Sequence, residues 1–521
     1  MKYQKHFQTK VTPQSQPIPG SNQVANSAGG FAFPVDDWTR LQRFLILGTE
    51  GGTYYINEKK LTVENAEAVL RCIKEDGPRV VETVFQISDK GRAPKNDPAL
   101  FVLAMCAGLG NEKTKRQALE VLSSVARIGT HLFHFADYVQ AFRGWGRALR
   151  RAIGAWYTEK DAEKLAYQLV KYQQRDGWSH RDLLRLAHPK PPTDKHGSLL
   201  NWATQGDEVP VGTIVDGFEQ AKTADEDRTI SLINEYGLTR EMINTAHLNS
   251  PAVWEALLEK MPMTAMIRNL GKMTQVGLIG PMSEASKLII GRLNDADVLH
   301  KARIHPLNVL VALRTYDQGR GYRGSLEWDA DQDIVDALDN AFYMAFDNIE
   351  PTGKNHVLGV DVSGSMGSGI MNMPLTARDA ACAMAMVARR TEPSVIRAFS
   401  NRFMELPVSP KTRLTDLIRH VNGLPFEGTD CSLPMVWALK NKIKAEVFVV
   451  YTDSETWAGN IHPVQALRQY RDKMGIPAKL IVVGMVSNGF SIADPNDGGM
   501  LDVVGFDTSV PSVMRGFILE G

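Results

Sequence analysis

The sequence is poor in cysteine, and it has neither a long apolar run nor an apolar leader at its N-terminus. Its 521 residues include four cysteines, scattered without a C-x-x-C pair, which argues against a disulfide framework and favours a reducing compartment. No run reaches 18 apolar residues, so we expect no membrane-spanning helix. The polar N-terminus lacks the apolar core of a secretory signal. Together these absences predict a cytoplasmic protein.

An excess of charge is absent as well. The 59 Lys and Arg residues balance 59 Asp and Glu residues, so the overall charge of the chain indicates no partner. The hydrophobic content of 43% is ordinary for a globular protein, and the length favours two or three domains rather than one.

Common catalytic motifs are missing too. His180-Arg-Asp-Leu183 resembles the catalytic loop of a protein kinase, but position 187 is Ala rather than Asn, and no glycine-rich phosphate loop accompanies it. The chain has no G-x-S-x-G, H-E-x-x-H or Walker A motif. No nucleophile–base pair or two-metal cluster is recognisable, so we expect a protein that is not an enzyme.

The C-terminal third contains short apolar runs rich in β-branched residues, which alternate with helical stretches. Such runs are typical of parallel strands buried on both faces, and the alternation predicts a doubly wound open sheet. The predicted strands are Val357–Val360, Val395–Phe399, Val447–Tyr451, Lys479–Val483 and Val503–Phe506.

Oxygen-bearing side chains follow two of these strands. Asp361, Ser363 and Ser365 come directly after the first strand, Thr429 lies further along, and Asp453 ends the strand that starts at Val447. Ligands of open α/β sheets bind at the carboxyl ends of the strands, and Mg²⁺ prefers oxygen ligands. The five residues therefore predict a divalent-cation site, most simply for Mg²⁺. The alternative is a serine-rich turn that caps the next helix.

This pattern resembles the metal-ion-dependent adhesion site of a von Willebrand factor A domain. We therefore predict such a domain over residues 351–521, which begins with a Pro-Thr-Gly-Lys hinge at 351–354. In that case the site could also bind a partner protein, whose Asp or Glu would complete the shell of the metal. A metal-dependent protein-adhesion module is thus the alternative function.

Residues 33–350 show apolar residues at helical spacing almost throughout. Many short helices joined by polar turns favour an α-solenoid of HEAT-like repeats, although no crisp period is present and a compact helical domain is the alternative. Residues 1–32 are predicted to be a polar N-terminal tail. The predicted architecture is thus multidomain, α and α/β.

A basic segment lies within the helical part. Residues 141–195 contain twelve Lys and Arg residues against six Asp and Glu residues. Lys171 and Arg175 are four residues apart, as are Arg181 and Arg185, so each pair is predicted to share a helix face, with His188 one turn further. Such a stripe could follow a phosphate backbone, while Trp and His rings stack on bases. The alternative is an ordinary solvated helix face.

The whole chain after the N-terminal tail resembles the Ro ribonucleoprotein autoantigen family, in its bacterial form, in which a TROVE module precedes a von Willebrand A-like domain. The stretches that carry the resemblance are 171–188, 266–273, 305–313, 350–354, 475–481 and 490–495. It implies a ring of HEAT-like repeats that binds Y RNA on its outer surface and takes single-stranded 3′ ends of misfolded non-coding RNA into its hole. It further implies a role in RNA quality control beside a 3′→5′ exoribonuclease similar to polynucleotide phosphorylase, tethered through the Y RNA, and a monomeric protein.

The resemblance places some residues by matching position. Lys171, Arg175 and His188 fall on the Y RNA surface of the family, and Arg268 and Lys272 are candidates for lining the hole. The loop 189–197 departs from the family pattern, which leaves RNA selectivity open. Charge and helical phase add further candidates, so that the predicted RNA-binding residues are Lys171, Arg175, His180, Arg181, Arg185, His188 and Lys190 on the surface, with Arg268 and Lys272 lining the hole.

Overall fold

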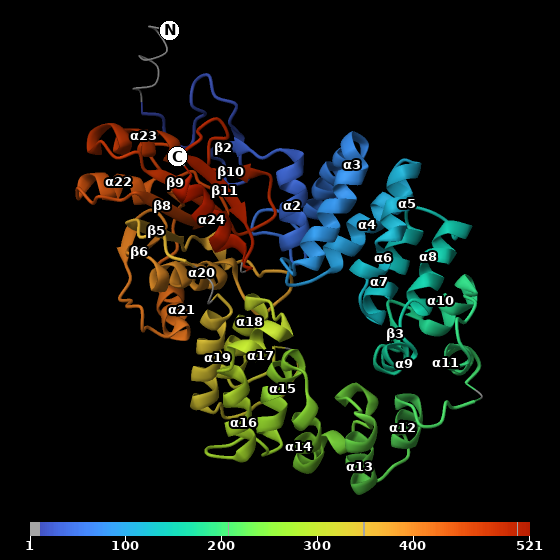
Figure 1. The fold of residues 1–521 in the computed structure, drawn as a ribbon. Coiled ribbons are helices and arrows are strands. Elements are labelled where there is room, and N and C mark those ends of the chain that lie inside the picture. Colours follow the sequence, from blue (N-terminus) through green and yellow to red (C-terminus); the bar gives the residue numbers. More distant parts are fainter. Residues whose placement is uncertain (1–10, 207, 323, 347–349, 508, 521) are drawn as a thin grey trace.

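The computed structural model describes residues 11–520, except 207, 323, 347–349 and 508. It consists of a long arc of helices and a C-terminal α/β domain that joins the two ends of the arc (Figure 1). Within the described residues, no helix combines the length and apolarity that a membrane span requires.

The helices of the arc follow one another in chain order, and each packs mainly on its neighbours, as expected for a solenoid. The first half consists of α2 (Asp37–Leu47), α3 (Glu58–Asp89), α4 (Asp97–Leu109), α5 (Glu112–Glu120), α6 (Leu122–Val125), α7 (Gly129–Gln140), α8 (Arg147–Thr158), α9 (Ala162–Lys171), α10 (His180–Ala187) and α11 (Asp194–Gln205). The second half consists of α12 (Ile214–Ala221), α13 (Glu226–Tyr236), α14 (Pro251–Lys260), α15 (Met263–Gln275), α16 (Glu284–Leu293), α17 (Ala296–Ala302), α18 (Pro306–Asp317) and α19 (Gln332–Met344), with short 3₁₀ turns η1 (Arg240–Met242) and η2 (His247–Asn249).

Local sequence explains where these helices begin and bend. Asn57 caps α3 by accepting a hydrogen bond from the backbone N–H of Lys60, as Asn favours at this position. The helix then bends where Asp76 leaves helical geometry two residues before Pro78, because proline lacks the N–H of a helix interior. α4 is apolar on every side and lies buried between α3 and α7.

The C-terminal domain contains a six-stranded sheet in the order β11-β9-β8-β5-β6-β7. All neighbouring pairs are parallel except β6 and β7, which are antiparallel at one edge. The strands are β5 (His356–Asp361), β6 (Ser394–Phe399), β7 (Phe403–Glu405), β8 (Val447–Thr452), β9 (Lys479–Gly484) and β11 (Met500–Val504). The predicted doubly wound sheet is therefore confirmed, although the last strand begins three residues earlier than Val503.

Alternate residues of the central strands enter two separate hydrophobic cores. Val449 and Tyr451 of β8 face one core, whereas Phe448 and Val450 face the other. Helices α20 (Ala377–Thr391), α21 (Leu414–Asn422) and α24 (Ser509–Leu519) contribute to the first core, and α22 (Leu433–Lys440) and α23 (Pro463–Met474) to the second. Burial on both faces explains why these strands are continuously apolar.

The N-terminal segment, predicted as a polar tail, packs on the C-terminal domain from residue 12 onward. Its strands β1 (Val24–Ala25) and β2 (Phe31–Pro34) form a small antiparallel sheet with β10 (Phe490–Ser491). Gln14 is fully buried, and its side-chain amide donates to Asp430 Oδ1 and to the carbonyl of Ile461, both at 2.8 Å. Gln14 thus satisfies buried polar groups of the C-terminal domain, although Ser15 and Gln16 beside it are exposed.

Two polar joints fix the ends of the arc to the C-terminal domain. At the first, the guanidinium of Arg43 from α2 is buried and donates to both carboxylate oxygens of Asp502 in β11, at 2.8 and 2.7 Å. At the second, Asp339 of α19 accepts the backbone N–H of Leu414 at 2.9 Å and pairs with Arg390 of α20 at 3.5 Å. The arc therefore closes into a ring through the α/β domain.

Removal of the Arg43 side chain should weaken the first joint strongly. Arg43→Ala leaves the carboxylate of Asp502 without its cation, which should cost about 3–5 kcal/mol in the free energy of unfolding. Arg71→Ala is a matched control, because Arg71 pairs with Asp37 on the exposed side of α2, where a pair contributes about 0–1 kcal/mol. Denaturant unfolding measures both variants, and equal losses would contradict the role given to Arg43.

Candidate metal centre and nucleic-acid surface

The predicted cation site lies where the direction of winding reverses in the sheet. Strands β5 and β8 are neighbours, but the chain continues from β5 to β6 on one side and from β8 to β9 on the other. Ligands of doubly wound sheets bind at such a switch point, outside the carboxyl ends of the strands. Asp361 is the last residue of β5, and Asp453 directly follows β8.

The side chains after β5 form a connected polar cluster. The backbone N–H of Ser363 donates to Asp361 Oδ1 at 2.9 Å, and the hydroxyl of Thr452 donates to Asp361 Oδ2 at 2.6 Å. The hydroxyl oxygens of Ser363 and Ser365 lie 3.1 Å apart. All four residues are buried, so their orientations are set by the protein rather than by water.

The loop after β8 brings the second carboxylate to this cluster. Asp453 interacts with the hydroxyl of Ser365 and accepts the backbone N–H of Glu455 at 3.1 Å. The carbonyl of Thr429 accepts the N–H groups of Trp457 and Ala458, at 3.0 and 2.9 Å, which ties the Thr429 loop to the same place.

Negative charge in this cluster lacks a matching cation. Burial raises the pKa of Asp361 to about 7, and the nearby charge of Asp453 adds to the effect. Burial likewise raises the pKa of Asp453. Within the described part of the chain, neither carboxylate forms an ion pair with Lys or Arg; the nearby Arg378 donates instead to the carbonyl of Ser363, at 3.0 Å.

The donor set fits a small hard cation. The buried hydroxyl of Ser454 has no hydrogen-bond partner among the residues that the structure describes, and the backbone of Ser454 adopts a left-handed φ of 63°, which is unusual for serine. The described residues contain no cluster of three or more His, Cys, Asp or Glu side chains that could hold a metal. An ion at this place would therefore depend on hydroxyl oxygens as well as on Asp361 and Asp453, as Mg²⁺ accepts.

Residues that the sequence did not single out complete the cluster. Glu455 accepts the backbone N–H groups of Ser27 and Ala28, at 2.8 and 3.1 Å, and burial together with the charge of Asp453 raises its pKa to about 7. Burial and the same acids raise the pKa of Tyr55 to about 12. The Asp-Ser-Glu spacing after β8 could have indicated Glu455, but no local signal links residues 27 and 28 to it.

The predicted RNA surface differs from a single helical stripe. Helix α9 ends at Lys171, and Arg175 lies in a hairpin of β3 (Gln174–Arg175) and β4 (Trp178–Ser179). The prediction that Lys171 and Arg175 share a helix face is therefore wrong. The physical reason is the two-residue turn Asp176-Gly177, in which both residues have positive φ, as a tight hairpin requires.

Lys171 and Arg175 lie in different environments, because Lys171 is half-buried and lines a cavity beside Glu241, whereas Arg175 is exposed. The ammonium of Lys171 donates to the hydroxyl of Tyr167 at 2.7 Å, and no carboxylate pairs with it in the described residues. Arg175 is exposed, with Asp176 at 3.7 Å as its ion-pair partner, a distance and exposure at which the pair is weak.

Helix α10 carries the helical face that the sequence predicts. Arg181 and Arg185 are exposed on one side, while Leu183 and Leu184 are buried on the other. Within residues 141–190, seven exposed Lys, Arg and His side chains form no ion pair with a described residue: Arg147, Arg150, Arg151, Arg181, Arg185, His188 and Lys190. Pro189 lies near Gly154 of α8, so the end of α10 and α8 form one continuous surface.

His180 does not belong to this surface, contrary to our prediction. Its ring is buried, hydrogen-bonds the hydroxyl of Tyr157 at 2.9 Å and packs against Phe133. Burial lowers the pKa of His180 to about 4, so the ring is neutral and takes part in the core. Because His180 is followed by the charged residues Arg181 and Asp182, the sequence did not indicate that it is buried in the core.

The two residues predicted to line the hole share one face of α15. Arg268 is exposed and within electrostatic reach of Tyr172 at the end of α9. Lys272 donates to the side chains of Asn249 and Gln275, at 2.9 and 2.8 Å. Arg268 is therefore the freer of the two cations.

Comparisons with known proteins cover nearly the whole chain. The model of the TROVE domain matches residues 24–214 and 234–315, and the model of the Ro60 vWA domain matches residues 355–518. The RNA-binding protein RO60 of Deinococcus radiodurans is 41% identical over 515 residues, covering 97% of each protein. The RNA-binding protein RO60 of Caenorhabditis elegans is 39% identical over 593 residues, covering 98% of this chain and 92% of that protein.

A solved structure is similar as well. The crystal structure of the Deinococcus radiodurans RO (RSR) protein superposes with a TM-score of 0.72 at 40% identity, covering 93% of this chain and 99% of that chain. The similarity thus extends through both the helical ring and the α/β domain.

Loss of one carboxylate should stabilise the metal-free protein at high pH. The pKa values of Asp361, Asp453 and Glu455 are raised in the fold, so the folded state binds more protons than the unfolded state, and stability falls as pH rises from about 4 towards about 8. Asp453→Asn removes one charge, and its amide can still bond Ser365 and Glu455. With chelator present, we expect a higher melting temperature for the variant at pH 8 and a smaller gain at pH 5. An equal gain in melting temperature at pH 5 and at pH 8 would contradict the repulsion between the carboxylates.

Proposed function

The chain belongs to the Ro60 family, and from this membership we propose that it is a non-catalytic protein that binds structured RNA. The observation that supports the proposal is the surface of unpaired cations on α8 and α10. Helix α10 has eight residues and is thus about 12 Å long, and it carries Arg181 and Arg185 ahead of His188 at its end. Cations spread over such a length can neutralise several phosphates of one RNA, because each neutralised phosphate releases counterions.

We propose Y RNA, a small structured non-coding RNA, as the ligand of this surface. The hairpin of β3 and β4 presents Arg175 next to Trp178, and the two residues form a cross-strand pair. A cation beside a partly exposed indole suits an RNA, which offers both phosphates and unpaired bases. Shape and unpaired ends, rather than base sequence in a duplex, would then select the RNA.

We further propose that the hole of the ring takes a single-stranded 3′ end of misfolded RNA, with Arg268 and Lys272 as candidate contacts. In this scheme the protein acts in RNA quality control, and the Y RNA tethers a 3′→5′ exoribonuclease similar to polynucleotide phosphorylase. The protein itself would supply binding and no cleavage, in keeping with its relatives, which are described as RNA-binding proteins.

The second candidate function is metal-dependent capture of a protein partner by the α/β domain. It is favoured by the uncompensated charge of Asp361 and Asp453. Mg²⁺ would be held by these carboxylates and by the hydroxyls of Ser363, Ser365 and Thr429, and it would supply a positive centre for an acidic side chain of the partner. Because the two candidate sites lie in different domains, both functions can coexist.

The double variant Lys171→Ala and Arg175→Ala tests the RNA surface. We expect at least tenfold weaker binding of a stem-loop RNA at 150 mM salt, and a shallower dependence of affinity on salt because two phosphate contacts are lost. Gel shifts or fluorescence anisotropy at several salt concentrations measure both quantities.

The control for this experiment is Lys440→Ala with Lys444→Ala. It removes the same charge from exposed positions at the end of α22, in the other domain. Its RNA affinity should stay within twofold of the unaltered protein. If the two double variants have equal affinity for the RNA, the surface of α8 to α10 is not the RNA site.

Chelation separates the two candidate functions. We expect Mg²⁺ to raise the melting temperature of the unaltered protein but not of Ser365→Ala, because a ligand that binds only the folded state stabilises it. Affinity for stem-loop RNA should be the same with Mg²⁺ or with chelator at matched ionic strength. If Mg²⁺ does not change the melting temperature of the unaltered protein, the proposed metal site is wrong. Loss of RNA binding on chelation would contradict the separation of the two sites.

A further inference from the structure

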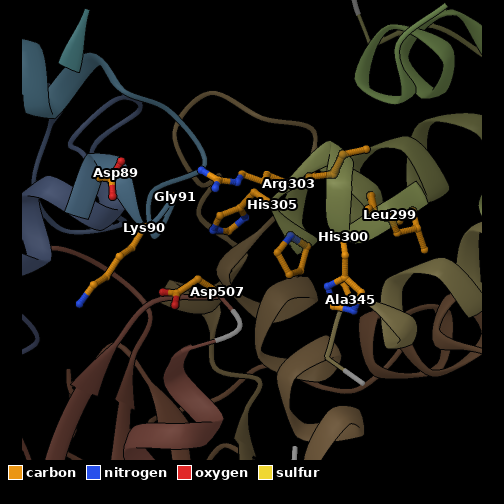
Figure 2. Close-up of a pocket in the computed structure, with 12 residues that line it drawn as sticks. Asp89, Lys90, Gly91, Leu299, His300, Arg303, His305, Ala345 and Asp507 are labelled. Atoms are coloured by element: carbon orange, nitrogen blue, oxygen red, sulfur yellow. The ribbon is translucent and has the colours of Figure 1, made fainter. Parts of the chain in front are cut away.

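A cavity of about 390 Å³ lies at the seam where α17, the start of α18 and the end of α19 face the end of α3 (Figure 2). Its polar groups do not converge on one ligand. Arg92 engages both His305 and Asp507, through its carbonyl at 3.2 Å and its Nε at 3.4 Å. Figure 2 shows the guanidinium of Arg303 apart from the ring of His300. The seam therefore joins α3, α18 and the C-terminal domain, and it presents no built binding site.

Exposed aromatic rings gather instead at the carboxyl ends of β5 and β8. In the part of the chain that the structure describes, five aromatic side chains are exposed, and four of them lie here: Tyr54, Tyr55, Phe426 and Trp457, with exposed fractions between 37% and 65%. The fifth, Tyr322, lies in the link between α18 and α19. Exposed rings that lie together mark interaction surfaces, in which Tyr, Trp and Phe are enriched.

The helical ring supplies two of these aromatic side chains. Tyr54 and Tyr55 lie in the loop between α2 and α3, with their ring centres 5.0 Å apart in an edge-to-face arrangement. Tyr55 is within electrostatic reach of Asp361, Asp453 and Glu455, so the pair borders the carboxylate cluster. Neither hydroxyl forms a hydrogen bond with a described residue, so both remain available to a partner.

The α/β domain supplies the other two aromatic side chains. The indole of Trp457 lies on Gly428, where a Cβ would be 2.8 Å from the ring, so the close contact requires glycine. The ring centre of Phe426 is 3.9 Å from the guanidinium of Arg378, which also donates to the carbonyl of Ser363 at 3.0 Å. Together with the two tyrosines, these rings form an aromatic rim around the carboxylate cluster.

Acidic groups dominate the loops of the aromatic rim. Four loops carry or border it, and they contain five Asp and Glu residues and no Lys or Arg: residues 49–57, 362–373, 424–430 and 453–460. Glu427 is exposed and forms no ion pair with a described residue. The exposed cations Lys59 and Arg402 lie just outside these loops and are fewer than the acids. The rim therefore repels a polyanion such as RNA, in contrast to the surface of α8 to α10.

Aromatic faces beside exposed carboxylates suit the side chain of arginine. Its planar guanidinium stacks on aromatic rings and pairs with carboxylates, whereas the ammonium of lysine is more strongly hydrated and gains less from stacking. The protein uses the same contact internally. Arg378 lies over Phe426, and the guanidinium of Arg79 is 3.9 Å from the ring centre of Trp38. Charge and ring chemistry thus favour one kind of partner.

We propose that the aromatic rim docks a segment of a partner protein that is rich in arginine. Guanidinium groups of the segment stack on Tyr54 and Trp457 and pair with Glu427. Because the rim spans the helical ring and the α/β domain, the bound segment contacts both. The proposal depends neither on RNA binding by the surface of α8 to α10 nor on a metal ion. It also differs from the second candidate function, in which the partner contributes an acidic side chain.

Three labelled peptides of twelve residues test the proposal by fluorescence anisotropy with the full chain. The first alternates arginine with glycine, the second lysine with glycine, and the third glutamine with glycine. We expect the arginine peptide to bind at least fivefold more tightly than the lysine peptide of equal charge, because only guanidinium stacks well on the rings. We expect the glutamine peptide to bind at least twentyfold more weakly than the arginine peptide. Equal affinities for arginine and lysine would contradict the stacking.

The double variant Tyr54→Ser and Glu427→Gln changes two exposed side chains, so its melting temperature should match that of the unaltered protein. We expect it to bind the arginine peptide at least tenfold more weakly. Tyr322→Ser is the matched control, because Tyr322 is an exposed aromatic residue outside the rim. Its affinity should stay within twofold of the unaltered protein. If the double variant and the control bind the peptide equally, the proposal is overturned.

Two further measurements separate this docking from the other proposed sites. A ten-residue oligo(U) is titrated into the same variants, and a loss of oligo(U) binding without a loss of peptide binding would make the rim an RNA contact and overturn the proposal. Ser365→Ala, which tests the metal site, should leave the affinity for the arginine peptide within twofold. A large loss with Ser365→Ala would tie the docking to the metal and contradict its independence.

Discussion

Closure of the helical arc by the C-terminal domain is the constraint on which the other features depend. A solenoid has two free ends, and here both ends are held by buried polar contacts, through Arg43 at α2 and Asp339 at α19. Such contacts are directional, so they fix the orientation of the domain as well as its position. The helical ring and the carboxylate cluster at the ends of β5 and β8 are therefore held in one arrangement (Figure 1).

A net charge of zero hides two regions of opposite, uncompensated charge. Among the described residues, cations without ion-pair partners gather on α8 and α10, whereas carboxylates without cations gather after β5 and β8. Each region gains free energy from an external charge of the opposite sign, a polyanion in one place and a divalent cation in the other. Charges paired within the fold, such as Arg43 with Asp502, contribute to structure instead. Pairing, rather than the number of charges, thus separates binding surfaces from structural ones.

The sequence was informative where local patterns determine structure. Continuous apolar runs located the strands, and Asp361 and Asp453 could be placed because parallel strands bring their carboxyl ends to one edge. Prediction failed where a short turn or a distant contact decides the outcome. Asp176-Gly177 turned an expected helix into a hairpin, and a core of aromatic rings took up His180. The packing of residues 12–34 on the α/β domain depends on contacts more than 400 residues away, which no local pattern encodes.

The central claim, that RNA lies on the surface formed by α8, β3–β4 and α10, is tested most directly by photocrosslinking. A stem-loop RNA with photoreactive uridines would be irradiated with the full chain, and the crosslinked peptides identified by mass spectrometry. The account predicts crosslinks within residues 141–195, concentrated near Trp178 and the end of α10, and their disappearance at high salt. Crosslinks that lie mainly in the α/β domain, or that persist unchanged at high salt, would contradict it.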